Sequence, residues 1–138
     1  AWMDLQIYER FGDRPPQLVA TSLNFSWNGL DDQAVQVLVE YLLSRSICVQ
    51  ILKLHRNSIS DGGAWALGHL LAHSELPILE VHLSHNHITA KGALAILECI
   101  ARSGRYPFQA DKGVRRDERC RAPVWLRLEH NNINWIPI

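Results

Sequence analysis

The sequence contains few cysteines, no excess of one charge and no long apolar run. Its three cysteines, Cys48, Cys99 and Cys120, fit a reducing compartment better than a framework of disulfides. Lysine plus arginine and aspartate plus glutamate number 14 each, so the overall charge favours neither nucleic acid nor an anionic membrane as a partner. No stretch approaches the roughly 20 apolar residues that a membrane span needs, and the first residues lack the pattern of a signal peptide. We therefore expect an intracellular protein, in the cytoplasm or nucleus, with no membrane contact.

Sequence patterns that indicate catalysis or a bound cofactor are also missing. There are no recognisable acid pairs, no glycine-rich phosphate loop and no serine–histidine–aspartate order. His82, His85 and His87 lie close in sequence, but the last two flank Asn86 and should not converge with the first on one side. No cysteine pair or nearby carboxylate completes a metal shell around them. We expect no metal site, no cofactor and no enzymatic activity.

What the sequence does contain is a block that recurs four times. The pattern apolar-x-apolar-x-x-Asn-x-apolar occupies residues 23–30, 52–59, 81–88 and 126–133. Its asparagines are spaced by 29 residues, 29 residues and then 45 residues. A fixed period of this length is typical of proteins built from stacked structural repeats. The four asparagines are Asn28, Asn57, Asn86 and Asn131.

Each of the first three asparagines is followed by the same helical pattern. Apolar residues recur 7, 10, 13 and 14 positions after it, which is the spacing of one face of a helix. Before each asparagine, apolar residues alternate as they do in a strand. Small residues six positions after it, Ala34, Gly63 and Gly92, should let the start of the helix lie close to its neighbours. Each repeat therefore predicts a strand, a turn at the asparagine and a helix.

The 29-residue period and the Asn-x-Leu-x-x-x-Gly spacing resemble the ribonuclease-inhibitor-like subclass of the leucine-rich repeat family, over about residues 18–136. The resemblance implies an α/β fold, a short, curved, right-handed solenoid of strand–helix units with the parallel sheet on its concave side. It predicts a leucine-rich repeat domain at residues 18–138, with about three and a half repeats, after an N-terminal capping segment at 1–17. The asparagine side chain should satisfy backbone groups that leave the sheet at the bend.

The last interval between asparagines contains 16 extra residues. This basic insertion lies near 104–121, has a net charge of +3 and should form a surface loop. Arg115 and Arg116 are its candidate partner contacts. No fourth helix follows Ile133, so we expect an open C-terminal end of the solenoid that further chain or a partner subunit covers.

Stacking would bring equivalent polar strand positions into columns on the concave face. These columns are rich in tryptophan, arginine and histidine, and tryptophan and arginine are frequent in the hot spots of protein interfaces. The resemblance implies that another protein binds there, so we interpret the chain as a non-enzymatic protein-binding module. The candidate partner-binding residues are Trp27, Lys53, His55, Arg56, His82, His85, Trp125, Arg127, Glu129 and His130, with Arg115 and Arg116 as auxiliaries.

Two alternatives stay open at this point. The same face could contact RNA as a targeting domain of a longer multidomain enzyme such as a nuclease, because aromatic rings stack on bases and arginine neutralises phosphates. Nucleic acid is the less favoured of the two partner classes. A regulator of a small GTPase is a further alternative, since a related repeat architecture has that role, although no residue here matches a specific motif for it.

Overall fold

The computed structural model describes residues 18–109 and 121–134 of the 138-residue chain. The predicted capping segment (1–17), residues 110–120 of the insertion with Arg115 and Arg116, and residues 135–138 lie outside the described residues. None of the helices in the described part is long and apolar enough to cross a membrane. In chain order the elements are β1 (Val19–Asn24), α2 (Asp32–Ser44), β2 (Cys48–Lys53), α3 (Asp61–His73), β3 (Glu80–His82), α4 (Ala90–Ser103), β4 (Phe108–Gln109), β5 (Arg121–Ala122) and β6 (Trp125–Arg127).

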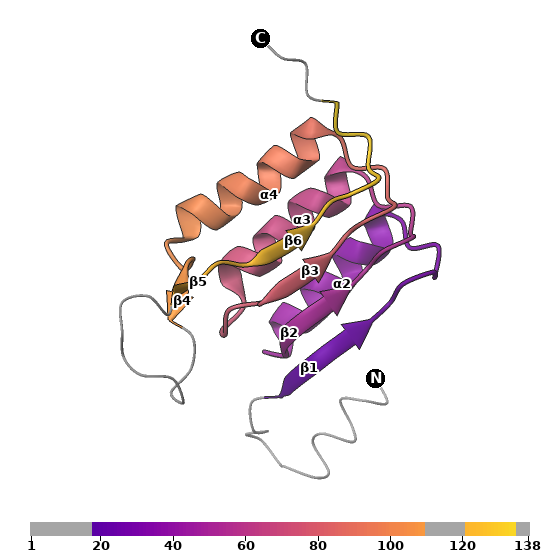
Figure 1. Cartoon of the computed structure of the whole chain (residues 1–138). Helices are drawn as coiled ribbons and strands as arrows, with labels where there is room; N and C mark the ends of the chain where they lie inside the picture. Colours follow the sequence, from indigo (N-terminus) through magenta and orange to yellow (C-terminus); the bar gives the residue numbers. More distant parts are fainter. Residues whose placement is uncertain (1–17, 110–120, 135–138) are drawn as a thin grey trace, which may run out of the picture.

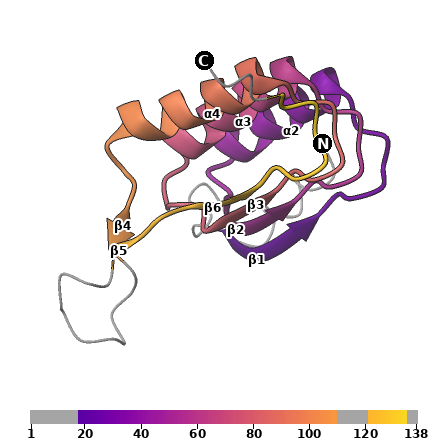
Figure 2. The same cartoon turned by 45° about the horizontal axis from the view of Figure 1, so that its top comes forward.

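Four parallel strands form one sheet in the order β1-β2-β3-β6, and α2, α3 and α4 all cover the same face of it (Figures 1 and 2). Equivalent positions of successive repeats pair across the sheet. Ser22 pairs with Ile51, Ile51 with Glu80, and Glu80 with Trp125. The four repeats are therefore adjacent rungs of one stack, which confirms the predicted α/β repeat solenoid.

The core lies between the sheet and the helices. Three sets of residues point into it. They are the alternating apolar residues of each strand, the apolar residue two positions after each asparagine, and the predicted apolar face of each helix. Full burial of one such side chain contributes roughly 1.5–3 kcal/mol relative to exposure. The buried residues of the second and third strand–turn segments include Leu52, Leu54, Ile59, Val81, Leu83 and Ile88, and those of the helices include Val35, Val39, Leu42, Leu67, Leu70, Leu71, Ala93 and Ile96.

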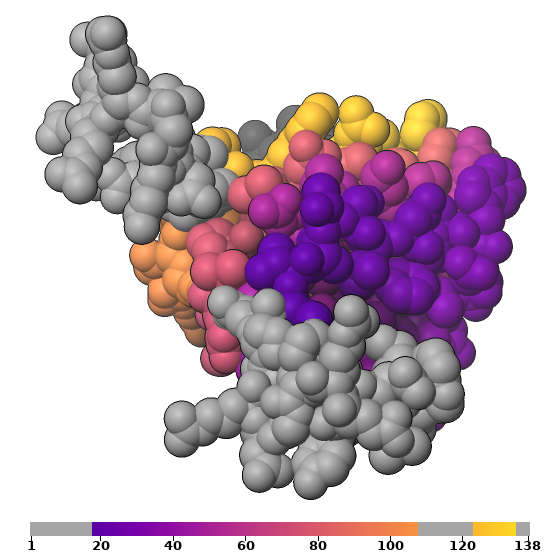
Figure 3. All heavy atoms as spheres, turned by 90° about the horizontal axis from the view of Figure 1, so that it is seen from below, coloured from indigo at the N-terminus to yellow at the C-terminus, as the bar shows by residue number. Residues whose placement is uncertain are grey.

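The ends of the stack are less covered than its middle. Leu128 of the fourth repeat is only half-buried, whereas the equivalent Leu83 is fully buried. In the helix layer, Leu97 of α4 is 46% exposed, although the equivalent Val39 of α2 is 3% exposed. Figure 3, seen from the side of the first repeat, shows β1 and its turn in indigo at the near end of the stack. At the opposite end, the exposure of Leu97 and Leu128 shows that apolar surface is open at the C-terminal edge of the described residues.

The insertion starts and ends in a short two-stranded stem rather than in loop alone. β4 pairs with β5 in antiparallel register, Phe108 opposite Ala122. Before the stem, the Tyr106 hydroxyl accepts from the backbone N–H of Ile78 and donates to its carbonyl, and burial raises the pKa of Tyr106. The Arg105 guanidinium donates to two backbone carbonyls near the end of α3. These contacts anchor the first residues of the insertion to the helix layer and to the residues before β3.

The asparagine side chains connect neighbouring turns, as the sequence predicts. The Asn57 Oδ1 accepts from the backbone N–H of Leu30 at 3.0 Å, and its Nδ2 donates to the carbonyls of Phe25 and Leu54. Each buried asparagine therefore satisfies backbone groups of its own repeat and of the preceding one. The same arrangement recurs at Asn86 and Asn131.

A second set of hydrogen bonds joins the helix starts. Asp32 of α2 accepts from the backbone N–H and the hydroxyl of Ser60, the N-cap residue of α3. Asp61 of α3 accepts in the same way from Thr89, the N-cap residue of α4, at 2.8 Å and 2.6 Å, and also from the N–H of Gly92. Backbone N–H groups at a helix start have no partner within the helix. The carboxylate of one repeat thus caps the helix of the next.

Acid titration should detect this carboxylate cap. Burial works against the charge of Asp61, but the hydrogen bonds from Thr89 and Gly92 outweigh it and, with Lys91, lower the pKa of Asp61 below its ordinary value. A lowered folded-state pKa adds stability above the unfolded-state pKa, and this stability is lost as the pH falls through the lowered value. We expect Asp61→Asn to show a shallower loss of stability below about pH 4 than the unsubstituted chain, measured by urea unfolding at a series of pH values. Equal slopes for both proteins would contradict this.

Candidate binding surface

Polar and aromatic side chains form the face of the sheet opposite the helices. Leu52 and Leu54 point into the core, so Lys53 between them points to the other face. The sheet register places Lys53 beside His82 and His82 beside Arg127. We call this surface the open sheet face. Its residues are Ser22, Asn24, Ser26, Ile51, Lys53, His55, Glu80, His82, Ser84, Trp125, Arg127 and Glu129.

The residue before each asparagine has a left-handed backbone. The φ angles are +62° at Trp27, +56° at Arg56, +56° at His85 and +57° at His130. We call these four residues the turn column. A residue with a side chain adopts this conformation at a cost of about 1 kcal/mol, whereas glycine adopts it freely. Large side chains are therefore present at four positions where the backbone favours glycine.

The planar groups of the turn column stack in two pairs. The Arg56 guanidinium carbon lies 4.5 Å from the centre of the Trp27 ring. The rings of His85 and His130 lie 4.3 Å apart with an angle of 14° between their planes. The Trp27 side chain is nevertheless 69% exposed. The stacking thus restricts the indole orientation without covering it.

A similar arrangement occurs on β6, at the other end of the sheet. The Arg127 guanidinium carbon lies 4.7 Å from the centre of the Trp125 ring, and the His82 ring meets that indole edge-on at 6.5 Å. Trp125 is 53% exposed. The Nε of Arg127 is buried without a hydrogen-bond partner among the described residues. Arg127 and His82 therefore hold a second tryptophan that remains more than half exposed.

His55 occupies the middle of the surface, between the two tryptophans in repeat order. Its Nδ1 lies 2.9 Å from the Ser26 hydroxyl of the preceding repeat. Desolvation lowers the pKa of His55, and the positive charges of His82, Lys53, Arg56 and Arg127 lower it further. This histidine is consequently neutral near pH 7.

Carboxylates are few on this surface. Glu80 Oε2 lies within hydrogen-bond distance of His82 Nε2, at 2.9 Å. Glu129 lies next to His130 and is exposed. The pKa of His85 is lowered mainly by desolvation, and the positive charges of Arg56, His130 and His55 lower it further.

The structure brings together all ten predicted site residues that it describes. Trp27, Lys53, His55, Arg56, His82, His85, Trp125, Arg127, Glu129 and His130 lie on the open sheet face or in the turn column. The stem of the insertion precedes β6, so it is attached at the end of the sheet opposite the turn column (Figure 1). In the described part of the chain, no three histidine, cysteine, aspartate or glutamate side chains are grouped so that they could hold a metal ion.

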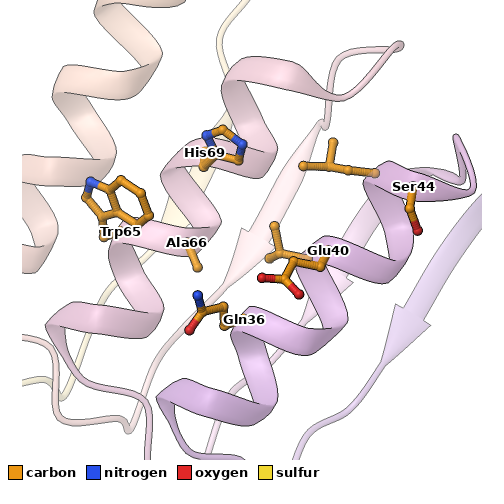
Figure 4. A pocket seen from close by; sticks show the side chains of 8 residues that line it. Gln36, Glu40, Ser44, Trp65, Ala66 and His69 are labelled. Atoms are coloured by element: carbon orange, nitrogen blue, oxygen red, sulfur yellow. The ribbon is translucent and has the colours of Figure 1, made fainter.

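Sequence reasoning missed a groove of about 560 Å³ between α2 and α3, on the opposite side of the molecule. Figure 4 shows its lining residues, with Gln36 and Glu40 on α2 and Trp65, Ala66 and His69 on α3. Trp65 is 60% exposed, and its ring stacks on His69 at 6.1 Å. The sequence did contain a signal for this groove. Trp65 is eight residues after Asn57, and this position lies outside the apolar face predicted for the helix, so a large apolar side chain was to be expected on the outer surface.

Comparison with known proteins adds two findings. The sequence profile of a family described as "Leucine Rich repeat" matches residues 21–39 and 77–97. A solved structure described as "Leiomodin-1 Actin-Binding Site 2 (ABS2)" is similar, with a TM-score of 0.56 and 20% sequence identity; the likeness covers 84% of this chain and 56% of that chain. Among curated proteins there is no match.

The two matched segments coincide with strand–turn–helix units of the stack. They begin in β1 and just before β3, and they extend into α2 and α4. This chain spans little more than half the length of the similar solved structure, and at 20% identity that likeness concerns the fold. The ribonuclease-inhibitor-like subclass stays a prediction. The repeated geometry shows an α/β repeat solenoid, and two of its strand–turn–helix units are similar to the family described as "Leucine Rich repeat".

Proposed function

We propose that the chain is a non-enzymatic protein-binding module whose partner binds at the open sheet face and the turn column. The leucine-rich repeat stack supports a protein-binding role, because stacked repeats create extended surfaces suited to such partners. The observation that supports this surface most directly is its pair of exposed tryptophans. Trp27 and Trp125 are each stacked by an arginine and remain more than half exposed.

Exposed indole rings that are already oriented suit a binding surface. An indole that is already held in place loses little conformational entropy on binding, and tryptophan and arginine are enriched among interface hot spots. The left-handed backbone of the turn column supports the same conclusion. Each of its side chains is present in spite of a backbone cost that glycine would avoid.

The similar solved structure bears the name of an actin-binding site, and its likeness to this chain concerns the fold. Actin is therefore one outcome of the tests below rather than the proposed partner. An intracellular location, contacts from the insertion, and coverage of the open C-terminal edge by further chain or a partner subunit stay predictions.

Site-specific crosslinking in the native cell would identify the partner and its surface. A photoreactive amino acid is placed at Trp27 or Trp125, and the control positions are Val37 and Trp65 on the helix layer, which are also about 60% exposed. We expect one protein to be captured at both Trp27 and Trp125, and at neither control position. Capture at the helix positions alone would show that the partner binds the other side of the molecule and would refute the proposal.

A single substitution should then separate binding from folding. Arg56→Gly removes the guanidinium that stacks on Trp27, yet glycine suits the φ of +56° at this position. We expect the free energy of unfolding to change by no more than about 1 kcal/mol, while affinity for the captured protein falls by about tenfold or more in calorimetric titration. Trp65→Ala on α3 is the matched control and should leave affinity unchanged. Unchanged affinity in Arg56→Gly would argue against a role for the turn column.

A further inference from the structure

The charges of the proposed surface indicate what its partner presents. Three fixed cations, Lys53, Arg56 and Arg127, lie there with two carboxylates, Glu80 and Glu129. Glu80 Oε2 already has a partner within β3, since it lies 2.9 Å from His82 Nε2. The chain as a whole has no net charge, so the positive charge of this face is local. A partner with carboxylates would complement it.

Two of these cations lie in a row with a histidine between them. The sheet register places Lys53, His82 and Arg127 side by side on three adjacent strands. Parallel strands are about 4.8 Å apart, so the row extends over roughly 10 Å across the sheet. Arg56 lies beyond the end of β2 and close to the Trp27 ring. The two exposed tryptophans therefore flank a basic centre.

Four histidines in this surface can add to its charge. His55, His82, His85 and His130 all belong to it, and with neutral histidines the net charge of the face is +1. Protonation of all four would raise the net charge to +5. The groups facing them come from every strand of the sheet: Ser26 after β1, Lys53 and Arg56 at β2, Glu80 on β3, and Trp125, Arg127 and Glu129 at β6.

Building on the proposed function, we propose that the open sheet face and turn column bind an acidic segment of a partner protein, and that protonation of the surface histidines tightens this binding. Carboxylates of the segment lie over the Lys53–His82–Arg127 row. Apolar side chains of the same segment pack on the two exposed indoles.

The direction of the pH effect follows from linkage. The pKa values of His55 and His85 are lowered in the unbound protein, chiefly by desolvation and then by neighbouring positive charge. A bound carboxylate favours the imidazolium, so binding raises these pKa values. A group whose pKa rises on binding strengthens the complex below its unbound pKa, and this contribution is lost as the pH rises through its bound pKa. Affinity should therefore increase as the pH falls below neutrality.

A protein partner is favoured over nucleic acid by the two carboxylates of the face. Glu80 lies beside Trp125 in the sheet register, and Glu129 lies beside the His85–His130 pair. A continuous phosphate backbone crossing the surface would approach both carboxylates and be repelled. A protein segment can place its acidic residues over the cations and other side chains over the glutamates.

Fluorescence anisotropy with the full chain tests the proposal. The probe is a labelled peptide in which glutamate alternates with leucine. The comparison probes are the glutamine–leucine and lysine–leucine peptides of equal length and a single-stranded oligothymidylate. We expect the glutamate peptide to bind most tightly, and its affinity to rise by at least about threefold between about pH 7.5 and about pH 6.

Two pairs of variants assign the effect to this face. Lys53→Gln with Arg127→Gln should weaken binding of the glutamate peptide by about tenfold at both pH values, whereas Lys91→Gln with Arg102→Gln, an equal charge change on α4, should not. His85→Asn with His130→Asn should reduce the ratio between the affinity at about pH 6 and the affinity at about pH 7.5, and asparagine tolerates the left-handed backbone at both positions.

Three results would overturn the proposal. They are glutamine-peptide binding as tight as glutamate-peptide binding, tighter binding of oligothymidylate, or equal effects of the α4 pair and the sheet pair. These outcomes leave the crosslinking test of the protein-binding function untouched. Loss of crosslinking at Trp27 and Trp125, by contrast, would refute that function whatever the peptides do.

Discussion

Asn86→Ala is expected to lower the free energy of unfolding by about 3–5 kcal/mol, a large part of the 5–15 kcal/mol typical of a domain. Its Oδ1 accepts from the N–H of Ile59 at 3.0 Å, and its Nδ2 donates to the carbonyls of Leu54 and Leu83 at 3.0 Å each. Alanine would leave these backbone groups without partners in a place that water does not reach, because Asn86 is only 4% exposed. Urea unfolding followed by circular dichroism measures the change.

Asn28→Ala provides the matched control for this prediction. Asn28 has the same place in the first repeat, but its side chain is exposed and its Nδ2 donates to the carbonyl of Ser26 two residues away. We expect that variant to lose no more than about 1 kcal/mol. Asn86→Asp should cost at least as much as Asn86→Ala, since a buried carboxylate keeps the acceptor but faces the two carbonyl oxygens without a donor. A similar loss for Asn28→Ala and Asn86→Ala would show that the bonds between repeats are not the source of the stability.

The sequence sufficed to predict this part of the fold because asparagine spacing, strand alternation and helix periodicity share one register. Register also explains why the open sheet face was predictable: once Leu52 and Leu54 point into the core, Lys53 must point to the other side. The columns across the sheet then follow from the 29-residue period alone.

The stacking within the surface was not predictable from the sequence. It depends on the left-handed backbone at Trp27, Arg56, His85 and His130, and none of these is a residue type for which a positive φ could be assumed from sequence. The tilt of each side chain toward its neighbour is set by this angle. Sequence spacing therefore places the four residues in a column but does not show that Trp27 pairs with Arg56.

The aspartate caps were missed although the sequence contained a signal for them. Aspartate occurs four residues after the asparagine in the first two repeats, at Asp32 and Asp61, and serine or threonine precedes that position in the next repeat. Sequence reasoning explained Gly63 and Gly92 by helix packing in general. The structure gives the specific cause, since a Cβ at either glycine would meet the carboxylate of the preceding repeat. Within the described residues no carboxylate of a preceding repeat faces Ala34, and the first repeat departs from the glycine pattern.

Gly92→Ala is consequently expected to lower the free energy of unfolding by about 2–4 kcal/mol. The added Cβ would overlap with Asp61 Oδ1, lie 2.9 Å from Ile88 Cγ2 and 3.0 Å from Asp61 Cα. The last contact involves backbone, so rotation of a side chain cannot relieve all of the overlap. Displacing the carboxylate would also break its hydrogen bonds to Thr89, the N-cap residue of α4.

A double-mutant cycle with Asp61→Ala shows whether the carboxylate is the cause. In that background Gly92→Ala no longer meets Oδ1, so it should cost at least about 1 kcal/mol less than in the unsubstituted chain. The reverse change in the first repeat, Ala34→Gly, should cost no more than about 1 kcal/mol, the ordinary penalty of glycine in a helix. Additive costs of Asp61→Ala and Gly92→Ala would mean that the two positions act independently. In that case packing of α4 against α3, rather than the carboxylate, would be the reason for the glycine.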